Sequence, residues 1–269
     1  MDRGWTRVAL LGLAASVAAS GVQAAQTPAS LNVSAVYDGS LLIKLLDLRL
    51  RTRIAGQRYS ADAHVESSGA VSFIRRFDIN AASVGGFANA RPVPAAYVQH
   101  SLEGKKRSSR TLVFRTASAE ADPLTQGVRM SATPMSSAPC PGAMPTYDGK
   151  QRYDLILTYR GRGALAPEQR GLGLSDPVVC RLDFRPISGF KVNNQQGLRR
   201  FVQGDIRATF AKVPASGIWV ASDISADTLV GALHLRLISL SVQGSRAAFE
   251  PPAAPKPPAA PARKPRGGR

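Results

Sequence analysis

The sequence is poor in the residues that most often carry catalytic chemistry or bind metals. Its 269 residues include two cysteines, three histidines and 18 acidic residues. No Cys-x-x-Cys, His-x-His or His-Glu-x-x-His spacing is present, so the common motifs of dithiol redox chemistry and of zinc sites are missing. We therefore expect no cofactor, no metal ion and a non-enzymatic role.

Catalysis by carboxylates is the enzymatic alternative that the sequence leaves open. Acidic side chains far apart in the chain can meet when strands pair, and two carboxyl groups are sufficient for glycoside hydrolysis. The candidates in this sense are Asp62, Glu66, Asp154 and Asp183. The alternatives to a ligand-binding role are therefore an envelope hydrolase and a purely structural module that binds a partner.

Acidic residues are outnumbered by 35 lysines and arginines, which gives a formal net charge of +17. A surface that binds nucleic acid usually places aromatic side chains among its basic ones, and the cluster Lys105-Lys106-Arg107 has none. In an exported chain the anionic partners are an envelope lipid, lipopolysaccharide or an acidic polymer. Near an anionic membrane each basic residue contributes about 1 kcal/mol. We expect such a partner and no nucleic acid.

Long apolar runs are absent, apart from one near the N-terminus. Arg3 and Arg7 precede an apolar run over residues 8–19, and Val22-Gln23-Ala24 supplies small residues where signal peptidase cleaves. The run is too short to span a bilayer, although a membrane anchor is the alternative interpretation. We predict a cleaved signal peptide over residues 1–24, a periplasmic location and no transmembrane segment in the mature chain.

Runs of strong helix formers are missing, and alternation with a period of two takes their place. Leu46, Leu48 and Leu50 alternate with charged residues, and residues 58–66 alternate again. Such alternation is typical of antiparallel strands with one buried face. We predict an all-β fold in which a curved or barrel-like antiparallel sheet forms a single domain over residues 31–245.

Glycine and proline separate the alternating stretches. We expect turns or breaks in regular structure at Asp38-Gly39, at Gly85-Gly86 and over residues 91–94, which include two prolines. Residues 127–133 are expected to form a short strand.

The C-terminal segment has almost no large apolar side chain. Residues 250–269 are rich in proline and alanine and carry basic residues. A segment of this composition has little apolar surface to bury, and proline favours an extended, solvated chain. We predict a disordered tail.

The two cysteines, Cys140 and Cys180, are informative because the chain is predicted to be exported. Two thiols in an oxidising compartment usually pair. A disulfide between them would close a loop of roughly forty residues and stabilise the fold by about 3–4 kcal/mol in the chain-entropy model. Free or redox-active thiols are the alternative.

The segment between the cysteines also carries a family resemblance. After Cys140 come Tyr147-Asp148-Gly149, Arg152 and Tyr153, and after Cys180 comes Pro186-Ile187-Ser188-Gly189-Phe190. In this order the residues resemble the exported bacterial domain of unknown function family 3108. The motif residues of the resemblance are Tyr147, Asp148, Gly149, Arg152 and Gly189. It implies an exported, mainly antiparallel β protein with no assigned activity or cofactor, and the basic tail departs from its pattern.

These observations lead to a functional hypothesis. We expect an exported periplasmic protein that is not an enzyme and that binds an apolar or anionic component of the cell envelope. A curved sheet that closes into a small barrel can surround one ligand. Tyr97, Tyr153 and Phe190 are the candidate residues for lining that site.

Overall fold

The computed structural model describes residues 30–69, 72, 76–115, 119–190, 202–228 and 231–245. The first half of the chain forms β1 (Ser30–Ser40), β2 (Lys44–Ala55), β3 (Arg58–Ser67), β4 (Phe77–Ala88), β5 (Arg91–Glu103) and β6 (Lys106–Val113). The second half forms α2 (Pro123–Ala132), β7 (Gly142–Tyr147), β8 (Arg152–Arg162), α3 (Pro167–Arg170), β9 (Ser175–Ser188), β10 (Val202–Val213), β11 (Ile218–Thr228) and β12 (Gly231–Gly244). The predicted signal peptide and the predicted tail lie outside the described residues.

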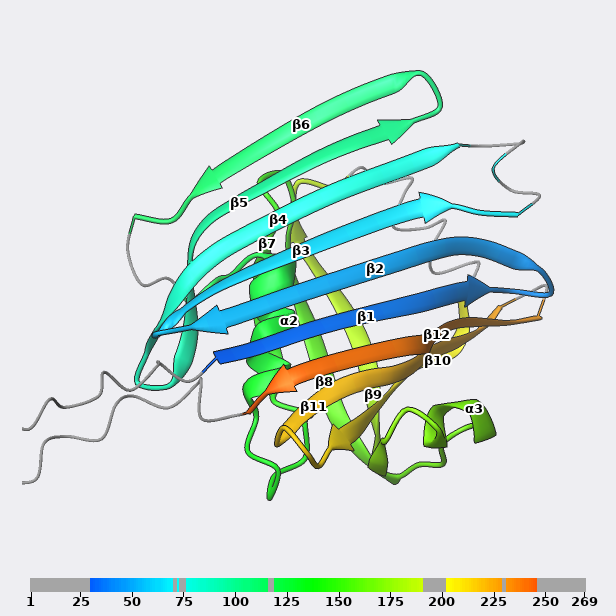
Figure 1. Ribbon diagram of the computed structural model, residues 1–269. Coiled ribbons are helices and arrows are strands. Elements are labelled where there is room, and N and C mark those ends of the chain that lie inside the picture. Colours follow the sequence, from blue (N-terminus) through cyan, green and yellow to red (C-terminus); the bar gives the residue numbers. More distant parts are fainter. Residues whose placement is uncertain are drawn as a thin grey trace, which may run out of the picture.

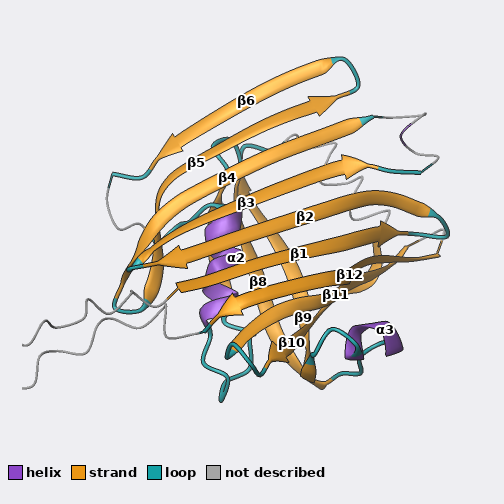
Figure 2. Ribbon diagram, viewed as in Figure 1, coloured by secondary structure: helices purple, strands orange, loops and turns teal. Residues whose placement is uncertain are grey.

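The strands form one antiparallel sheet made of two meanders. Its order is β6-β5-β4-β3-β2-β1-β12-β11-β10-β9-β8-β7. Strands that are neighbours in sequence are paired, except for β6 and β7 at the two edges, and β1 pairs with β12 and so joins the two meanders side by side. Figure 2 shows how strands dominate the structure. The prediction of an all-β fold with a curved or barrel-like antiparallel sheet is confirmed.

The sheet curves until its two edge strands approach each other, with α2 on the concave side (Figure 1). The edges β6 and β7 are not hydrogen-bonded as strands in the sheet. Instead, Arg110 of β6 donates a hydrogen bond of 2.8 Å from Nη1 to Oδ2 of Asp148, which follows β7. Ala121, just before α2, forms an isolated bridge with Thr146 of β7. Side chains and the segment preceding α2 thus connect the edges.

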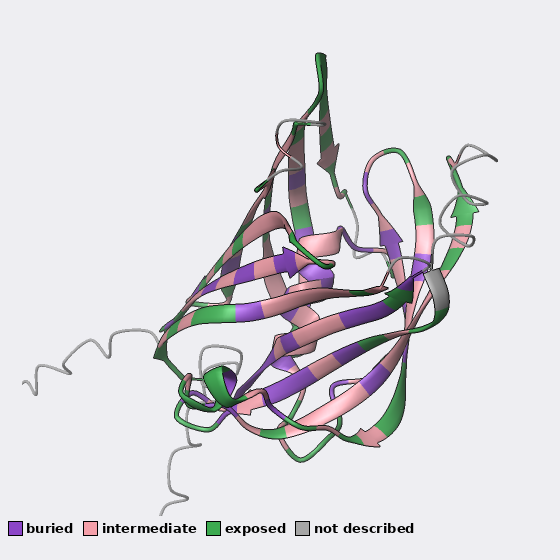
Figure 3. Cartoon of the chain, turned by 90° about the vertical axis from the view of Figure 1, so that its right-hand side faces the viewer, coloured by how far each residue is buried: buried purple, intermediate pink, exposed green. Residues whose placement is uncertain are grey.

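Alternation along the strands places the core between α2 and the concave face. Ile54, Tyr59, Val128 and Leu237 are among the buried residues that pack together there, and buried and exposed positions alternate along many strands (Figure 3). None of the described helices is both long enough and apolar enough to cross a membrane.

The predicted break at Gly85-Gly86 is wrong, since both glycines lie inside β4. The proline-containing stretch 91–94 likewise begins β5 rather than interrupting the sheet. Gly85 is needed for a close approach, because an added Cβ would lie 2.6 Å from the hydroxyl oxygen of Tyr59. It pairs with Pro94 at a register shift between β4 and β5, where a proline is tolerated.

The predicted turn at Asp38-Gly39 is also displaced. These residues end β1, and the chain reverses after them, over residues 41–43. A turn signal that lies within a long hairpin is overridden when cross-strand pairing continues past it.

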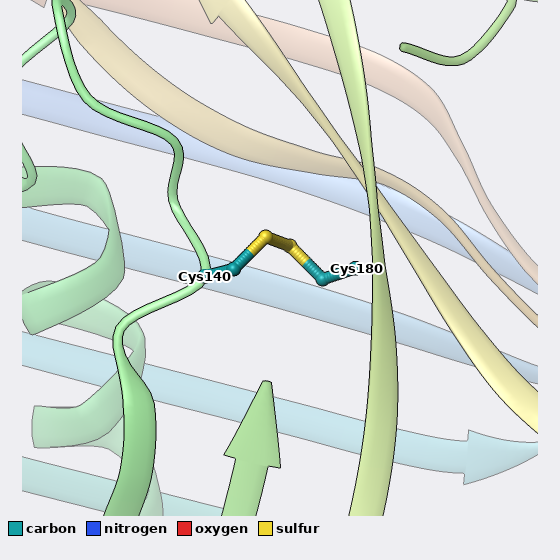
Figure 4. The surroundings of a disulfide bond; sticks show 2 residues. All are labelled: Cys140 and Cys180. Carbon is teal, nitrogen blue, oxygen red and sulfur yellow. A yellow bond between two sulfur atoms is a disulfide. The ribbon is translucent and has the colours of Figure 1, made fainter. Parts of the chain in front are cut away.

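The predicted disulfide between Cys140 and Cys180 is confirmed. It joins the segment between α2 and β7 to β9, with 5.9 Å between the two Cα atoms (Figure 4). Cys180 is fully buried, and the bond packs in a cluster with Met144, Phe210 and Trp219. The bond therefore holds the chain that leaves α2 against the second meander.

Candidate functional site

Helix α2 begins where it does because of two adjacent residues. Asp122 caps the helix, since its Oδ1 accepts hydrogen bonds from the backbone N–H groups of Leu124 and Thr125, both at 3.0 Å. Pro123 occupies the first turn, where a missing N–H costs no helical hydrogen bond. The prediction of a short strand over residues 127–133 is wrong, because this start signal places most of that stretch in the helix.

A buried polar network attaches α2 to the sheet. The second oxygen of Asp122, Oδ2, accepts hydrogen bonds from Thr125 Oγ1 at 2.6 Å and from Ser83 Oγ of β4 at 2.9 Å. Since the Thr125 hydroxyl donates to Asp122, its oxygen is left to accept from the Tyr59 hydroxyl of β3, at 2.6 Å. Burial raises the pKa of Tyr59, so the phenol remains a donor at neutral pH. Asp122 and Thr125 are fully buried, which fixes the position of the helix on the sheet.

Replacing Asp122 with alanine is expected to lower the free energy of unfolding by about 2–3 kcal/mol, because the helix loses its cap and two buried hydroxyls lose an acceptor. Urea unfolding followed by circular dichroism measures the change. Asp122→Asn is the matched control, since an asparagine oxygen still caps a helix, and it should lose less. A change below about 0.5 kcal/mol for Asp122→Ala would show that the network is not important for stability.

An apolar cavity of about 280 Å³ lies between α2 and the concave face of the sheet. We call it the α2 cavity. The helix lines it with residues that include Leu124, Gly127, Val128 and Ser131. The strands line it with residues that include Tyr37, Leu48, Leu50, Phe210, Trp219 and Leu235. Its walls come from β1, β2, β3, β10, β11 and β12, so both meanders contribute.

The cavity exists because small residues face each other across it. Gly127 and Ser131, one helical turn apart, lie on the cavity-facing side of α2. Opposite them the sheet presents Ala35 of β1, Ala61 of β3 and Ala221 of β11. A Cβ added to Gly127 would find no atom within 4 Å. Larger residues at these positions would fill the space as an ordinary core.

Polar groups in the α2 cavity are few and largely neutral. Tyr37 crosses the concave side, where its hydroxyl donates a hydrogen bond of 3.0 Å to the carbonyl oxygen of Ala221. Burial raises the pKa of Tyr37, so the phenol is uncharged at physiological pH. The Trp219 indole N–H, another polar group of the wall, is directed to the carbonyl oxygen of Pro134 at 3.4 Å. The charged residue among those that line the cavity is Asp62 of β3, which is exposed. The arrangement suits an apolar ligand.

The three aromatic residues predicted to line a ligand site lie outside the α2 cavity. Tyr97 is 2% exposed on β5 and donates a hydrogen bond of 2.8 Å to Gln99 Oε1. Tyr153 of β8 and Phe190 lie together, with ring centroids 6.2 Å apart, and Phe184 contacts both rings. Burial raises the pKa of Tyr97 and that of Tyr153. Their role in ligand binding stays a prediction.

The motif residue Asp148 shapes the turn between β7 and β8. Its Oδ1 accepts hydrogen bonds from the backbone N–H groups of Lys150 at 2.9 Å and Gln151 at 2.7 Å. Its Oδ2 accepts the bond from Arg110 that connects the sheet edges. Gly149, next in the turn, has a positive φ of 90° and lies against Leu112 of β6. These two motif residues therefore have a structural role.

The remaining motif residues support the same turn. Arg152 forms an ion pair with Glu120, with 3.1 Å between Nε and Oε1, and its guanidinium lies 4.3 Å from the centroid of the Tyr147 ring. Gly189 has a φ of 82°, and an added Cβ would overlap the carbonyl oxygen of Lys150. The turn therefore packs closely against the end of β9.

The carboxylates considered for hydrolysis occupy ordinary positions on the sheet. Glu66, Asp154 and Asp183 each form an ion pair with an arginine of the same or a neighbouring strand, and Asp62 is exposed. Pairs of opposite charge on a sheet surface commonly stabilise strand pairing. In the described part of the chain no group of three or more His, Cys, Asp or Glu side chains is placed to hold a metal ion. No observation favours the hydrolase alternative.

Sequence reasoning misses the helix side of the cavity. Asp122-Pro123 is a recognisable helix start and could have revealed α2. Leu48 and Leu50 lie on the apolar face of a strand that the alternation predicts. No local signal shows that Gly127 lines the same cavity as Ala35 and Ala221, since these residues are far apart in the chain.

No protein-family model matches the chain, and no curated protein matches it. Among solved structures, the chain is similar to one described as a β-barrel-like protein of domain of unknown function DUF1849 from Brucella abortus. The sequence identity is 11% and the TM-score is 0.46, with 81% of this chain and 99% of that chain covered. Membership in family 3108 is not shown by these matches.

Proposed function

We propose that the protein is an exported, non-enzymatic envelope protein that holds an apolar ligand, such as a single acyl chain, in the α2 cavity. The observation that carries this proposal is the hollow beside α2, whose walls are mostly apolar. Its volume of about 280 Å³ lies just below the range of drug-sized sites, about 300–1,000 Å³, which suits a slender ligand.

The size and character of the cavity suit a chain of methylene groups. Each buried methylene contributes about 0.8 kcal/mol, so about ten of them contribute about 8 kcal/mol. That free energy corresponds to a dissociation constant of about 1 μM before the cost of ordering the ligand is subtracted. The tyrosine and the indole in the wall are uncharged, and the carboxylate of Asp62, the charged lining residue, is exposed and can stay hydrated.

The compartment in this proposal is the periplasm. It is supported by the N-terminal sequence pattern of residues 1–24 and by the disulfide, which is typical of proteins that fold in an oxidising environment. The ligand would then come from the envelope, where lipids, lipopolysaccharide and acidic polymers are the anionic or apolar components. Among these, lipids and lipopolysaccharide carry the acyl chains that fit the cavity.

Fluorescence quenching by a brominated long-chain fatty acid tests the proposal. A chain that begins after residue 24 contains a single tryptophan, Trp219, and this residue lines the cavity. We expect saturable quenching with a dissociation constant in the micromolar range, because bromine atoms on a bound chain lie close to the indole. A brominated short-chain acid is the control and should not quench at the same concentration. Equal quenching by both acids, or none by either, would contradict the proposal.

A further inference from the structure

The connection between β1 and β2 exposes adjacent aliphatic side chains. Residues Leu41, Leu42 and Ile43 form this connection, which we call the apolar tip. Leu42 is 87% exposed and Ile43 is 54% exposed. Single exposed apolar residues are common, whereas neighbouring ones at a protruding turn are typical of a contact surface. Lys44 beside the tip is paired with Asp38 at 3.3 Å and Asp47 at 2.6 Å. These three side chains have a net charge of −1, so the positive charge needed at an anionic surface must come from elsewhere on the rim.

The same rim of the sheet carries a basic turn. Because neighbouring strands are antiparallel, the connections β1–β2 and β5–β6 both lie at the end where β1 and β5 finish, as Figure 1 shows on its right side. The β5–β6 turn exposes Lys105, Lys106 and Arg107, with Glu103 as its acidic residue. Four strand spacings of about 4.8 Å separate the two connections along the rim. The apolar tip and a cluster of cations thus lie on the same rim of the sheet.

A row of leucines joins the apolar tip to the α2 cavity. Leu46, Leu48 and Leu50 of β2 alternate with charged residues and face the concave side, and we call them the β2 leucine row. Leu48 and Leu50 line the cavity. Leu46 lies over Gly39 of β1, since an added Cβ there would meet the Leu46 Cδ1 atom at 2.7 Å. At about 3.3 Å per residue, Leu48 lies about 13 Å from the start of β2.

We infer that the apolar tip docks on an anionic phospholipid bilayer and that the β2 leucine row leads the acyl chain from the bilayer into the α2 cavity. Leu42 and Ile43 enter the acyl region, while Lys105, Lys106 and Arg107 contact the phosphate groups. Two observations favour a membrane as the partner of the apolar tip. The basic residues on the rim complement anionic phosphate groups, and the β2 leucine row is continuous with the α2 cavity. Docking on the bilayer does not depend on the proposed function, whereas the passage of the acyl chain into the α2 cavity rests on it.

Co-sedimentation with vesicles tests docking. The vesicles contain equimolar phosphatidylcholine and phosphatidylglycerol, and pure phosphatidylcholine vesicles are the comparison. We expect binding to the anionic vesicles that weakens at high salt. Leu42→Asp should weaken it at least about tenfold, because an inserted leucine is replaced by an anion. Neutralising Lys105 and Lys106 to glutamine should weaken it about fivefold for each charge.

Val113→Asp is the matched control. Val113 is 71% exposed at the end of β6, on the opposite rim, so this change introduces the same charge away from the apolar tip. It should leave vesicle binding unchanged. The basic segment 250–269 is present in every variant, so its contribution cancels in the comparison.

Two results would overturn docking. One is equal vesicle binding by wild type and Leu42→Asp; the other is an equal loss for Leu42→Asp and Val113→Asp. The wild type could instead sediment as a dimer that Leu42→Asp dissociates, with vesicle binding unaltered. That result would show that the apolar tip contacts a second copy of the protein.

The passage of the chain has a separate readout. When the brominated acid is presented in vesicles, it should quench Trp219 of the Leu42→Asp variant at least about tenfold more slowly than Trp219 of the wild type. Equilibrium quenching by the acid in solution should be the same for both proteins. If the acid in solution does not quench Trp219 of the wild type, the proposed function is refuted and docking on the bilayer is not. If the rate of quenching by acid presented in vesicles is the same for Leu42→Asp and the wild type, only the passage of the acyl chain along the β2 leucine row is refuted.

Discussion

Replacing Gly127 with leucine is expected to weaken acyl-chain binding about 100-fold while raising the unfolding temperature. The new side chain would project into the α2 cavity, where a Cβ meets no atom within 4 Å. It would occupy the volume of about four carbon atoms of the ligand, worth about 3 kcal/mol of burial. Removing a glycine from a helix interior also contributes about 0.8–1 kcal/mol to stability. Quenching of Trp219 and a thermal melt measure the two effects.

Gly127→Ala distinguishes the effect of filling the cavity from the effect of a better helix-forming residue. Alanine gives the full gain in helix propensity and adds a single methyl group, so ligand binding should change only slightly. If both variants bind the brominated acid as tightly as the wild type, the ligand does not occupy the space beside Gly127. A fall in the unfolding temperature of Gly127→Leu, with a rise for Gly127→Ala, would show that leucine overpacks the cavity.

Removing the disulfide with Cys140→Ala and Cys180→Ala together is expected to lower the free energy of unfolding by about 3–4 kcal/mol. The bond closes a loop with a sequence separation of 40, and the unfolded chain regains the corresponding freedom when it is absent. For a domain of this size the unfolding temperature should fall by roughly 10 °C. Thermal unfolding followed by circular dichroism measures the change.

Reducing agent supplies the control for this second prediction. It should lower the unfolding temperature of the wild type toward that of the double variant and leave the double variant unchanged. The bond also holds the segment that leaves α2 beside Trp219. The double variant should therefore show an altered tryptophan emission spectrum below its unfolding temperature. An unfolding temperature that does not respond to reduction would contradict a stabilising disulfide.

Much of the sheet could be predicted from the chain because β-structure leaves a local signature. The alternation of Leu46, Leu48 and Leu50 with charged residues identifies β2, since every second side chain of a strand points to the same face. The same reasoning fails at residues 127–133, where β-like composition competes with the cap at Asp122. It also fails at Gly85, since close packing against Tyr59 explains this glycine better than a turn does.

The candidate site could be predicted only in part. The strand faces that wall the α2 cavity follow from alternation, but their partner α2 and the small residues that leave the space do not. Tyr97, Tyr153 and Phe190 illustrate the limit, since aromatic character alone does not say which face or which end of the sheet a residue occupies. Cavity walls are set by the volumes of side chains that meet across the fold.

Local sequence was sufficient for the fold class, because the period of two can be read within short segments. The pairing of the cysteines followed from their number and from the predicted export of the chain. The pairing of β1 with β12, the place of α2 on the concave face and the hollow beside Gly127 were decided only by tertiary structure. Leu31 pairs with Gly244 across nearly the whole described chain. Such contacts depend on shape and volume between distant residues, for which no short segment carries a signal.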